Sequence, residues 1–195
     1  MKTRICLIRH GVTEANQKRL YYGSSDIPLS KEGINAIQKL ASEGIYPDDD
    51  NAKYYTTGML RTEQTFSLIY GDCKREVLSF LRELDFGDFE MKGYEELKSD
   101  PDYQAWIRDT DGTVPPPGGE RTCDFRSRVL DGFADLLKKQ RKGMIVTVCH
   151  GGPIAEILQN TFPDEKASFY QWLPEPGHGY LLTAENGKIT EKESF

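Results

Sequence analysis

The sequence predicts an α/β fold in which strands and helices alternate along the chain. Three junctions carry this prediction, because each leads from a β-branched or aromatic run through a glycine into a helical pattern. The junctions lie at residues 7–11 (LIRHG), 54–61 (YYTTGMLR) and 146–152 (VTVCHGG). Because strands that alternate with helices are usually parallel neighbours, all three junctions are expected at one edge of the sheet.

Each of these junctions also carries a side chain suited to an anion. Arg9 and His10 follow the first strand, Arg61 opens the helix after the second, and His150 follows the third. Open α/β sheets bind ligands along this edge, where helix N-termini present unpaired N–H groups. Two arginines and two histidines are therefore expected to converge on a place suited to phosphate.

The first third of the chain contains a strand, a turn and a helix. Residues 3–9 are predicted to form a buried strand, and residues 13–17 a short helical turn. Residues 21–29 have loop composition, and Ser30 is placed to cap a helix that ends near residue 42. One apolar face of this helix is formed by Ile34, Ile37, Leu40 and Ala41.

The remaining elements follow the same alternation. A helix after Gly58 is expected to bury Leu60, Phe66, Leu68 and Ile69. A longer helix over residues 121–141 has core positions at Phe125, Val129, Phe133, Leu136 and Leu137. A further helix begins near Pro153, and strands are expected at residues 169–173 and 180–183.

Residues 84–119 interrupt this alternation with aromatic residues, charges and prolines. An insertion of this kind between core elements is often a lid. A compact helical subdomain that only covers the sheet is an equally good interpretation. The length of 195 residues predicts a single domain over residues 1–195 that carries this insertion.

The composition indicates which classes of partner are unsuited to this chain and in which cellular compartment it is expected. The chain has 25 Lys and Arg against 31 Asp and Glu, a net charge of −6, which argues against a general nucleic-acid partner. No apolar stretch approaches the roughly 20 residues that cross a bilayer, and residues 5–8 are too short for a signal-peptide core. We therefore expect a cytoplasmic protein with no membrane partner. Its widely separated cysteines favour reduced thiols over a zinc site or disulfide framework; they are Cys6, Cys73, Cys123 and Cys149.

Five motifs now resemble the histidine phosphatase superfamily, the phosphoglycerate mutase-like proteins. They occur in the order of that family at residues 9–16, 60–65, 81–90, 118–120 and 150–152. The resemblance implies a three-layer α/β/α sandwich around a mainly parallel sheet, with the site at the edge described above. It also implies phosphoryl transfer without a metal or other cofactor.

The resemblance assigns roles to residues at the junctions. His10 resembles the nucleophile that forms a phosphohistidine, a role that suits a neutral imidazole. Arg9 and Arg61 resemble the phosphate-binding arginines, and His150 the second histidine that donates to phosphate oxygens. Cys149 is expected to pack in the core, because adjacent strand residues point to opposite faces. Further contacts to substrate are expected from Asn16, Tyr22, Gly23 and Gly151.

Glu83 is the candidate general acid and base. It must be protonated when the leaving group departs, which burial or the phosphate charge would favour. Asp85 and Glu90 are its competitors, and only the resemblance selects Glu83 among the three. Glu120 is expected either to cap the long helix or to order the pocket. His178 is expected on a surface turn, although it could line the pocket.

The reaction class is a choice among alternatives. Mutases of the superfamily tend to be longer, and the insertion lacks an Arg-Arg pair, so we expect hydrolysis of a small phosphorylated metabolite. The short bacterial relatives include broad-specificity phosphatases and α-ribazole-5′-phosphate phosphatases, and the sequence does not choose between them. Mutase-type transfer and a catalytically silent phospho-ligand-binding protein are the alternatives. A metal held by His10 and His150 lacks ligands at recognisable spacing. Monomer and homodimer both stay open.

Overall fold

The computed structural model describes residues 2–165 and 167–195. At its centre lies a six-stranded sheet with the strand order β3-β2-β4-β1-β5-β6. The first four strands in this order are parallel, and β5 and β6 are antiparallel additions beside β1. The strands are β1 (Lys2–Arg9), β2 (Lys53–Thr56), β3 (Arg75–Val77), β4 (Gly143–Cys149), β5 (Gly179–Glu185) and β6 (Lys188–Ser194). The predicted mainly parallel sheet is confirmed.

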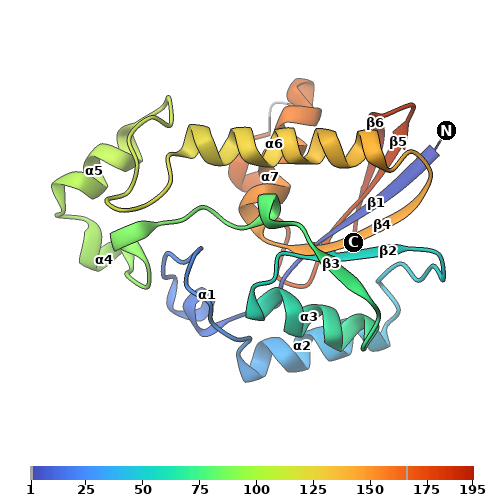
Figure 1. Cartoon of the computed structure of the whole chain (residues 1–195). Helices are drawn as coiled ribbons and strands as arrows, with labels where there is room; N and C mark the ends of the chain where they lie inside the picture. Colours follow the sequence, from blue (N-terminus) through green and yellow to red (C-terminus); the bar gives the residue numbers. More distant parts are fainter. Residues whose placement is uncertain (1, 166) are drawn as a thin grey trace.

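Helices cover both faces of this sheet, which gives the three-layer sandwich (Figure 1). The helices that form the two layers are α2 (Lys31–Ser42) and α3 (Leu60–Tyr70) on one face, and α6 (Thr122–Lys139) and α7 (Gly151–Thr161) on the other. Alternate side chains of β1 serve the two layers. Ile5 and Leu7 pack with α6 and α7, whereas Cys6 and Ile8 pack in the cluster that contains Phe66 of α3. The period of two is what a strand buried on both faces requires.

The three predicted junctions lie together. Arg9, the last residue of β1, pairs in register with Cys149, the last residue of β4. The parallel strand β2 ends beside them at Thr56. The residues that follow these strands therefore meet at one edge of the sheet, as the alternation predicts.

Most of the predicted helices are confirmed, but of the four α3 side chains expected to be buried only Phe66 is, and Leu68 and Ile69 are half-buried. The Ser30 hydroxyl accepts a hydrogen bond from Gly33 N–H at 3.0 Å and caps α2. The five predicted core positions of α6 are all buried. The prediction that Leu60 is buried is wrong, since its side chain is 40% exposed. Leu60 is the first residue of α3, and its N–H donates to Asp26, so its side chain lies at the solvent-facing start of the helix.

The strand predicted at residues 169–173 is also wrong. Residues Phe169–Trp172 form a short 3₁₀ helix, η4. Its start is stabilised by the side chain of Gln171, which accepts a hydrogen bond from Ser168 N–H at 2.7 Å. A serine followed three residues later by glutamine is a helix-start signal, and it outweighs the apolar alternation here. Trp172 is buried in the α6 and α7 core.

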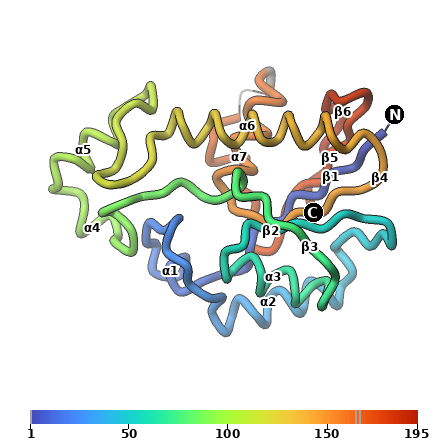
Figure 2. Tube along the Cα trace, in the orientation of Figure 1, coloured from blue at the N-terminus to red at the C-terminus, as the bar shows by residue number. Residues whose placement is uncertain are grey.

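The insertion lies beyond the carboxyl edge of the sheet, beside α1 (Glu14–Lys18) (Figure 2). It contains the 3₁₀ helix η2 (Gly87–Phe89) and the helices α4 (Tyr94–Leu97) and α5 (Pro101–Arg108), and it follows the 3₁₀ helix η1 (Ser79–Leu81). A small cluster of Phe89, Leu97 and Tyr103 forms its own centre. The Tyr21 and Tyr103 hydroxyls are hydrogen-bonded at 2.7 Å, which ties the insertion to the loop after α1.

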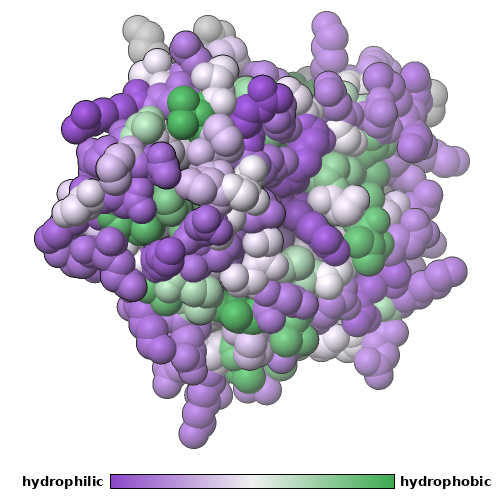
Figure 3. Space-filling view, turned by 60° about the vertical axis from the view of Figure 1, so that its left-hand side comes forward, coloured by the Kyte–Doolittle hydropathy of each residue, from purple (hydrophilic) through white to green (hydrophobic). Residues whose placement is uncertain are grey.

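The face turned towards the viewer in Figure 3 is mostly hydrophilic, and its hydrophobic residues form small separate patches. Within the described ranges, no helix combines the length and the apolar character needed to cross a membrane. A further 3₁₀ helix, η3 (Pro163–Glu165), lies between α7 and η4 in the chain.

Candidate active site

Two histidines and an arginine meet at the carboxyl edge of the sheet. The backbone N–H of His10 donates to the Cys149 carbonyl at 3.0 Å, which brings the ends of β1 and β4 together. The His10 and His150 rings are 5.2 Å apart between centroids. His10 is only 3% exposed, and Arg61 and His150 are fully buried. The structure therefore brings His10, Arg61 and His150 together at this edge, as predicted.

The tautomer of His10 follows from its hydrogen bond. Nδ1 lies 2.8 Å from the Gly11 carbonyl oxygen, which can only accept, so Nδ1 carries the proton. Nε2 is left with a free lone pair. Burial is the largest cause that lowers the pKa of His10 well below 6.5, and the Arg61 charge adds to it. His10 is therefore neutral at physiological pH and can act as a nucleophile through Nε2.

His150 is held on both sides of its ring. Arg61 Nε donates to Nδ1 at 3.3 Å, so Nε2 carries the proton of the neutral ring and donates to the Thr57 hydroxyl at 2.9 Å. Burial, followed by the charge of Arg61, lowers the pKa of His150 well below 6.5. Both ring nitrogens of His150 therefore have partners within the protein, Arg61 and Thr57.

Arg61 is a buried cation whose polar partners are neutral. Its two terminal nitrogens donate to the carbonyls of Ser25 at 2.9 Å and Gly23 at 2.8 Å. Its guanidinium lies 4.9 Å from the centroid of the Tyr22 ring. Burial lowers the pKa of Arg61 below its ordinary value. Among the described side chains, none with a carboxylate forms a salt bridge with Arg61, so an anion bound here would supply its missing counter-charge.

Arg9 and Asn16 present further donors to the same place. Arg9 Nη1 donates to the Pro174 carbonyl at 2.8 Å, while its buried Nε has no partner among the described residues. The Asn16 side-chain oxygen accepts from the Thr13 N–H, the Thr13 hydroxyl and the Tyr22 hydroxyl. With that oxygen committed, the Nδ2 amide group is the part of Asn16 that can donate to an anion.

Tyr22, Gly23 and Gly151 shape the walls of the site. Tyr22 covers the Arg61 guanidinium, and Gly23 supplies a carbonyl that holds it. A Cβ on Gly23 would lie 1.7 Å from the Leu84 carbonyl oxygen, so only glycine fits there. A Cβ on Gly151 would lie 3.3 Å from Arg9 Nε, which shows how closely the α7 start approaches that arginine.

Glu90 has a structural task that the sequence did not indicate. Its carboxylate accepts hydrogen bonds from the backbone N–H groups of Gly23, Ser24 and Ser25, and also from Phe86. These bonds fix the loop whose carbonyls hold Arg61. With four backbone donors on its two oxygens, Glu90 is committed to the loop and unsuited to proton transfer.

Glu83 is the carboxylate with access to the site. Its oxygens accept from the backbone N–H groups of Leu84 and Gly152, each at 3.0 Å. Gly152 is the second residue of α7, so this contact places Glu83 next to His150. Asp85 instead accepts from the Gly87 N–H and holds its own turn. Glu83 thus contacts the start of α7, whereas Asp85 and Glu90 bind the backbone of a turn and of a loop.

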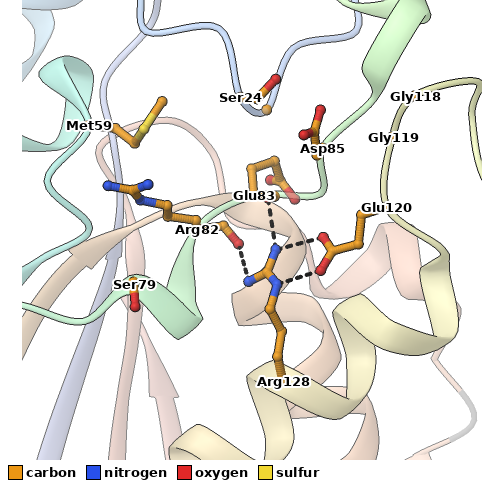
Figure 4. Close-up of a pocket in the computed structure, with 11 residues that line it drawn as sticks. Ser24, Met59, Ser79, Arg82, Glu83, Asp85, Gly118, Gly119, Glu120 and Arg128 are labelled. Atoms are coloured by element: carbon orange, nitrogen blue, oxygen red, sulfur yellow. Dashed lines mark hydrogen bonds and ion pairs between the residues drawn. The ribbon is translucent and has the colours of Figure 1, made fainter.

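Two cavities flank Glu83. One, of about 390 Å³, is polar and opens between Ser24, Met59 and Glu120 (Figure 4). The other, of about 490 Å³, has Arg9 and Glu83 in its lining together with aromatic walls. Its aromatic residues come from the loop after α1, the insertion, α6 and η4: Tyr21, Phe86, Trp106, Phe125, Phe169 and Tyr170. The second cavity can accept a flat apolar group attached to a phosphate.

The remaining predicted residues lie outside the convergence. Cys149 is buried in the α6 and α7 core, as predicted. His178 lies on a turn, where its backbone carbonyl accepts from the Arg9 N–H at 2.9 Å, and it lines neither cavity. Glu120 makes no cap bond to α6; both of its oxygens accept from Arg128. Within the described ranges, no group of three His, Cys, Asp or Glu side chains is placed to hold a metal.

The two buried histidines make stability depend on pH. Below pH 6.5 the unfolded chain binds protons at His10 and His150 that the folded chain does not, so acidification favours unfolding. Each histidine is expected to lower the free energy of unfolding by up to about 1.4 kcal/mol per pH unit below that value. Urea unfolding at pH 7.5 and 5.5 measures the slope, and His10→Gln should remove about half of the histidine contribution. An unchanged slope in the variant would contradict the buried neutral state.

Known proteins are similar to this chain in sequence and in fold. Residues 5–193 match a profile described as the histidine phosphatase superfamily (branch 1). An adenosylcobalamin/α-ribazole phosphatase of Salmonella typhimurium is 29% identical, with 89% of this chain and 87% of that protein covered. A 2,3-bisphosphoglycerate-dependent phosphoglycerate mutase of Bradyrhizobium diazoefficiens is 31% identical, with 79% and 78% covered. The crystal structure of the α-ribazole phosphatase from Shigella flexneri superposes with a TM-score of 0.82 at 27% identity, covering 96% of this chain and 93% of that one.

Proposed function

Since the chain belongs to the histidine phosphatase superfamily and is a phosphatase, we propose that it hydrolyses a small phosphate monoester through a phosphohistidine on His10, without a metal. The single observation that carries this proposal is the His10 tautomer. Gly11 holds the proton on Nδ1, which leaves the Nε2 lone pair free. A neutral imidazole beside a buried guanidinium is suited to attack on phosphorus.

In the first step, Nε2 of His10 forms a bond to phosphorus as the bond from phosphorus to the ester oxygen breaks. Arg9 and Arg61 donate to the non-bridging oxygens and neutralise their charge. Glu83, as the carboxylic acid, gives its proton to the departing oxygen. Asn16 Nδ2 completes the donors around the phosphoryl group, and neutral His150 holds the Arg61 guanidinium through Nδ1.

In the second step, water attacks the phosphohistidine. Glu83, now a carboxylate, takes a proton from that water, and the bond from phosphorus to Nε2 breaks. The products are inorganic phosphate and neutral His10, and Glu83 regains its proton. Because one carboxyl group serves both steps, its position relative to His10 controls both rates.

The aromatic cavity supports a substrate whose alcohol carries a flat apolar group. Its lining includes Arg9 and Glu83, the two residues that we propose to contact the phosphate and the leaving oxygen. Stacking on aromatic side chains and burial of a flat group favour binding there. Together with the relatives named α-ribazole phosphatase, this makes α-ribazole 5′-phosphate the first substrate to test.

The test is phosphate release from a panel of esters in the presence of EDTA. The panel contains α-ribazole 5′-phosphate, p-nitrophenyl phosphate, glycerol 3-phosphate and 3-phosphoglycerate. We expect turnover that EDTA leaves unchanged, with the highest kcat/KM for an ester that carries a flat apolar group. Loss of activity with EDTA would reject the metal-independent mechanism. Isomerisation of phosphoglycerates in the presence of 2,3-bisphosphoglycerate, at a rate above phosphate release, would favour the mutase instead.

Tyr170 at the cavity wall is expected to contribute to binding of flat substrates. It is 80% exposed, so Tyr170→Ala should change stability little. Loss of one aromatic contact is expected to raise KM for such an ester about 2- to 10-fold and to leave glycerol 3-phosphate unchanged. Tyr94→Ala is the matched control, because Tyr94 is also exposed and does not line the cavity. Equal effects on both esters would contradict the assignment of this cavity.

Gly152 is expected to be essential for the position of Glu83. A Cβ at residue 152 would lie 2.1 Å from Glu83 Oε1, so Gly152→Ala must displace the carboxylate. Residue 152 is helical, and the substitution should therefore keep or raise stability while kcat/KM falls about 100-fold. Thermal unfolding and kinetics together measure the two effects. In a Glu83→Ala background, Gly152→Ala should add no further loss; a full additional loss would show that it acts elsewhere.

A further inference from the structure

Arg128 of α6 uses every N–H of its guanidinium beside Glu83. Nη1 donates to the carbonyls of Phe80 and Arg82, both at 2.9 Å. Nη2 donates to the Glu83 carbonyl at 2.9 Å and to Glu120 at 2.8 Å, and Nε donates to Glu120 at 2.7 Å. Five N–H groups thus have five acceptor oxygens, three of them backbone carbonyls within residues 80–83. Figure 4 shows the bonds to Arg82, Glu83 and Glu120.

We propose that Glu120 and Arg128 are positioning residues that hold the backbone of Glu83 in place for proton transfer. This inference rests on the proposed role of Glu83 as general acid and base. Neither residue touches the phosphate-binding groups, and both act through the segment that carries Glu83.

The segment around Glu83 needs such support. It lies between η1 and the insertion, outside the sheet and the long helices. Among the described residues, the Glu83 carboxylate itself is held by two backbone N–H groups, those of Leu84 and Gly152. Arg128 fixes the chain at the Glu83 carbonyl, and the Glu120 N–H donates to the Asp85 carbonyl at 2.9 Å. The backbone is therefore held by hydrogen bonds on both sides of residue 84. A shift of about 1 Å in a catalytic group lowers the reaction rate about 100-fold.

Glu120 also balances the charge of Arg128. A cation next to Glu83 would favour the ionised carboxylate, which cannot protonate a leaving group. The Arg128 charge does reach the site, because it contributes to the lowered pKa of His150. The two-pronged contact with Glu120 neutralises that charge locally. Arg128 can then position Glu83 while its own charge is paired with Glu120.

The experiment compares esters with good and poor leaving groups. Arg128→Lys keeps the charge but has three donors and no planar fork, and Glu120→Gln removes the carboxylate charge. For glycerol 3-phosphate, whose alkoxide must be protonated, we expect kcat/KM to fall about 100-fold. For p-nitrophenyl phosphate, whose phenolate needs little protonation, the expected loss is below about 5-fold. Glu120→Gln should also move the alkaline limb of the pH profile to lower pH.

Two controls make the result specific. Arg121→Lys disrupts a similar two-pronged pair with Asp124 at the start of the same helix, where both side chains are exposed, and should leave both esters unchanged. Inhibition by inorganic phosphate should be unchanged in Arg128→Lys and Glu120→Gln if the site is otherwise intact. Should Arg128→Lys fail to fold, Glu120→Gln carries the test, because it is nearly isosteric.

Glu83→Gln separates this inference from the proposed function. If Glu83→Gln loses far more activity on the alkyl ester than on the aryl ester, Glu83 is the acid. Equal losses on both esters, or none, in Arg128→Lys and Glu120→Gln would then overturn the positioning role alone. If Glu83→Gln shows no such selectivity, the assignment of Glu83 itself is wrong.

Discussion

Replacing His10 with glutamine is expected to lower kcat/KM by roughly 10⁴-fold or more, the scale on which loss of a covalent nucleophile acts. Glutamine approximates the size of the ring but offers no nitrogen lone pair for attack on phosphorus. The Gly11 carbonyl that orients His10 and the buried Arg61 stay in place, so phosphate should still bind. The variant is therefore expected to lose phosphoryl transfer and to keep phosphate binding.

An alkaline quench of enzyme mixed with ³²P-labelled substrate measures the covalent intermediate directly. Wild type should carry one labelled phosphoryl group, and His10→Gln none. The chain has three histidines, and His178→Gln is the matched control, since His178 lies on a turn outside the His10 and His150 ring pair. Label that persists in His10→Gln, or more than about 1% residual activity, would place the nucleophile elsewhere.

The fold was predictable from the sequence wherever local pattern and tertiary packing agree. The apolar runs of β1 and β4 are buried on both faces, and the five core positions of α6 recur at helical spacing. Prediction failed at Leu60, where apolar character alone does not show which side of the first helical turn meets solvent. It failed again at Phe169–Trp172, where a local side-chain bond from Gln171 determines the backbone.

The site divides in the same way. His10, Arg61 and His150 follow strand ends or open helices, so the alternation alone indicates that they converge. Arg128 could not be predicted, because its carbonyl partners lie 45 to 48 residues away in the chain and carbonyls have no sequence signature. Glu90 is similar, since its task is to bind backbone N–H groups 65 to 67 residues away. The residues that stabilise the site do so through backbone groups distant in sequence, and such contacts can be identified only in the folded structure.

Replacing Arg61 with lysine is expected to lower kcat/KM by roughly 10³-fold, or about 4 kcal/mol of transition-state stabilisation. Three of the five guanidinium N–H groups are used by Ser25, Gly23 and His150, which leaves two for a phosphoryl group. Lysine has three donors on one nitrogen and cannot hold both loop carbonyls, the histidine ring and the phosphate. Because lysine keeps the positive charge, the loss in kcat/KM measures the contribution of the guanidinium geometry.

The same variant tests whether Arg61 is the buried counter-charge of the ligand. Inorganic phosphate should raise the unfolding temperature of the wild type, because a ligand at 100 times its Kd adds about 2.7 kcal/mol of stability. In Arg61→Lys this increase should shrink, because the lysine cannot direct two donors at the anion. Arg75→Lys is the control, since Arg75 pairs with Glu63 of α3 outside the site and should respond to phosphate like the wild type. A full phosphate effect in Arg61→Lys, with less than a tenfold loss in kcat/KM, would mean that the anion is held by Arg9 and the start of α7 instead.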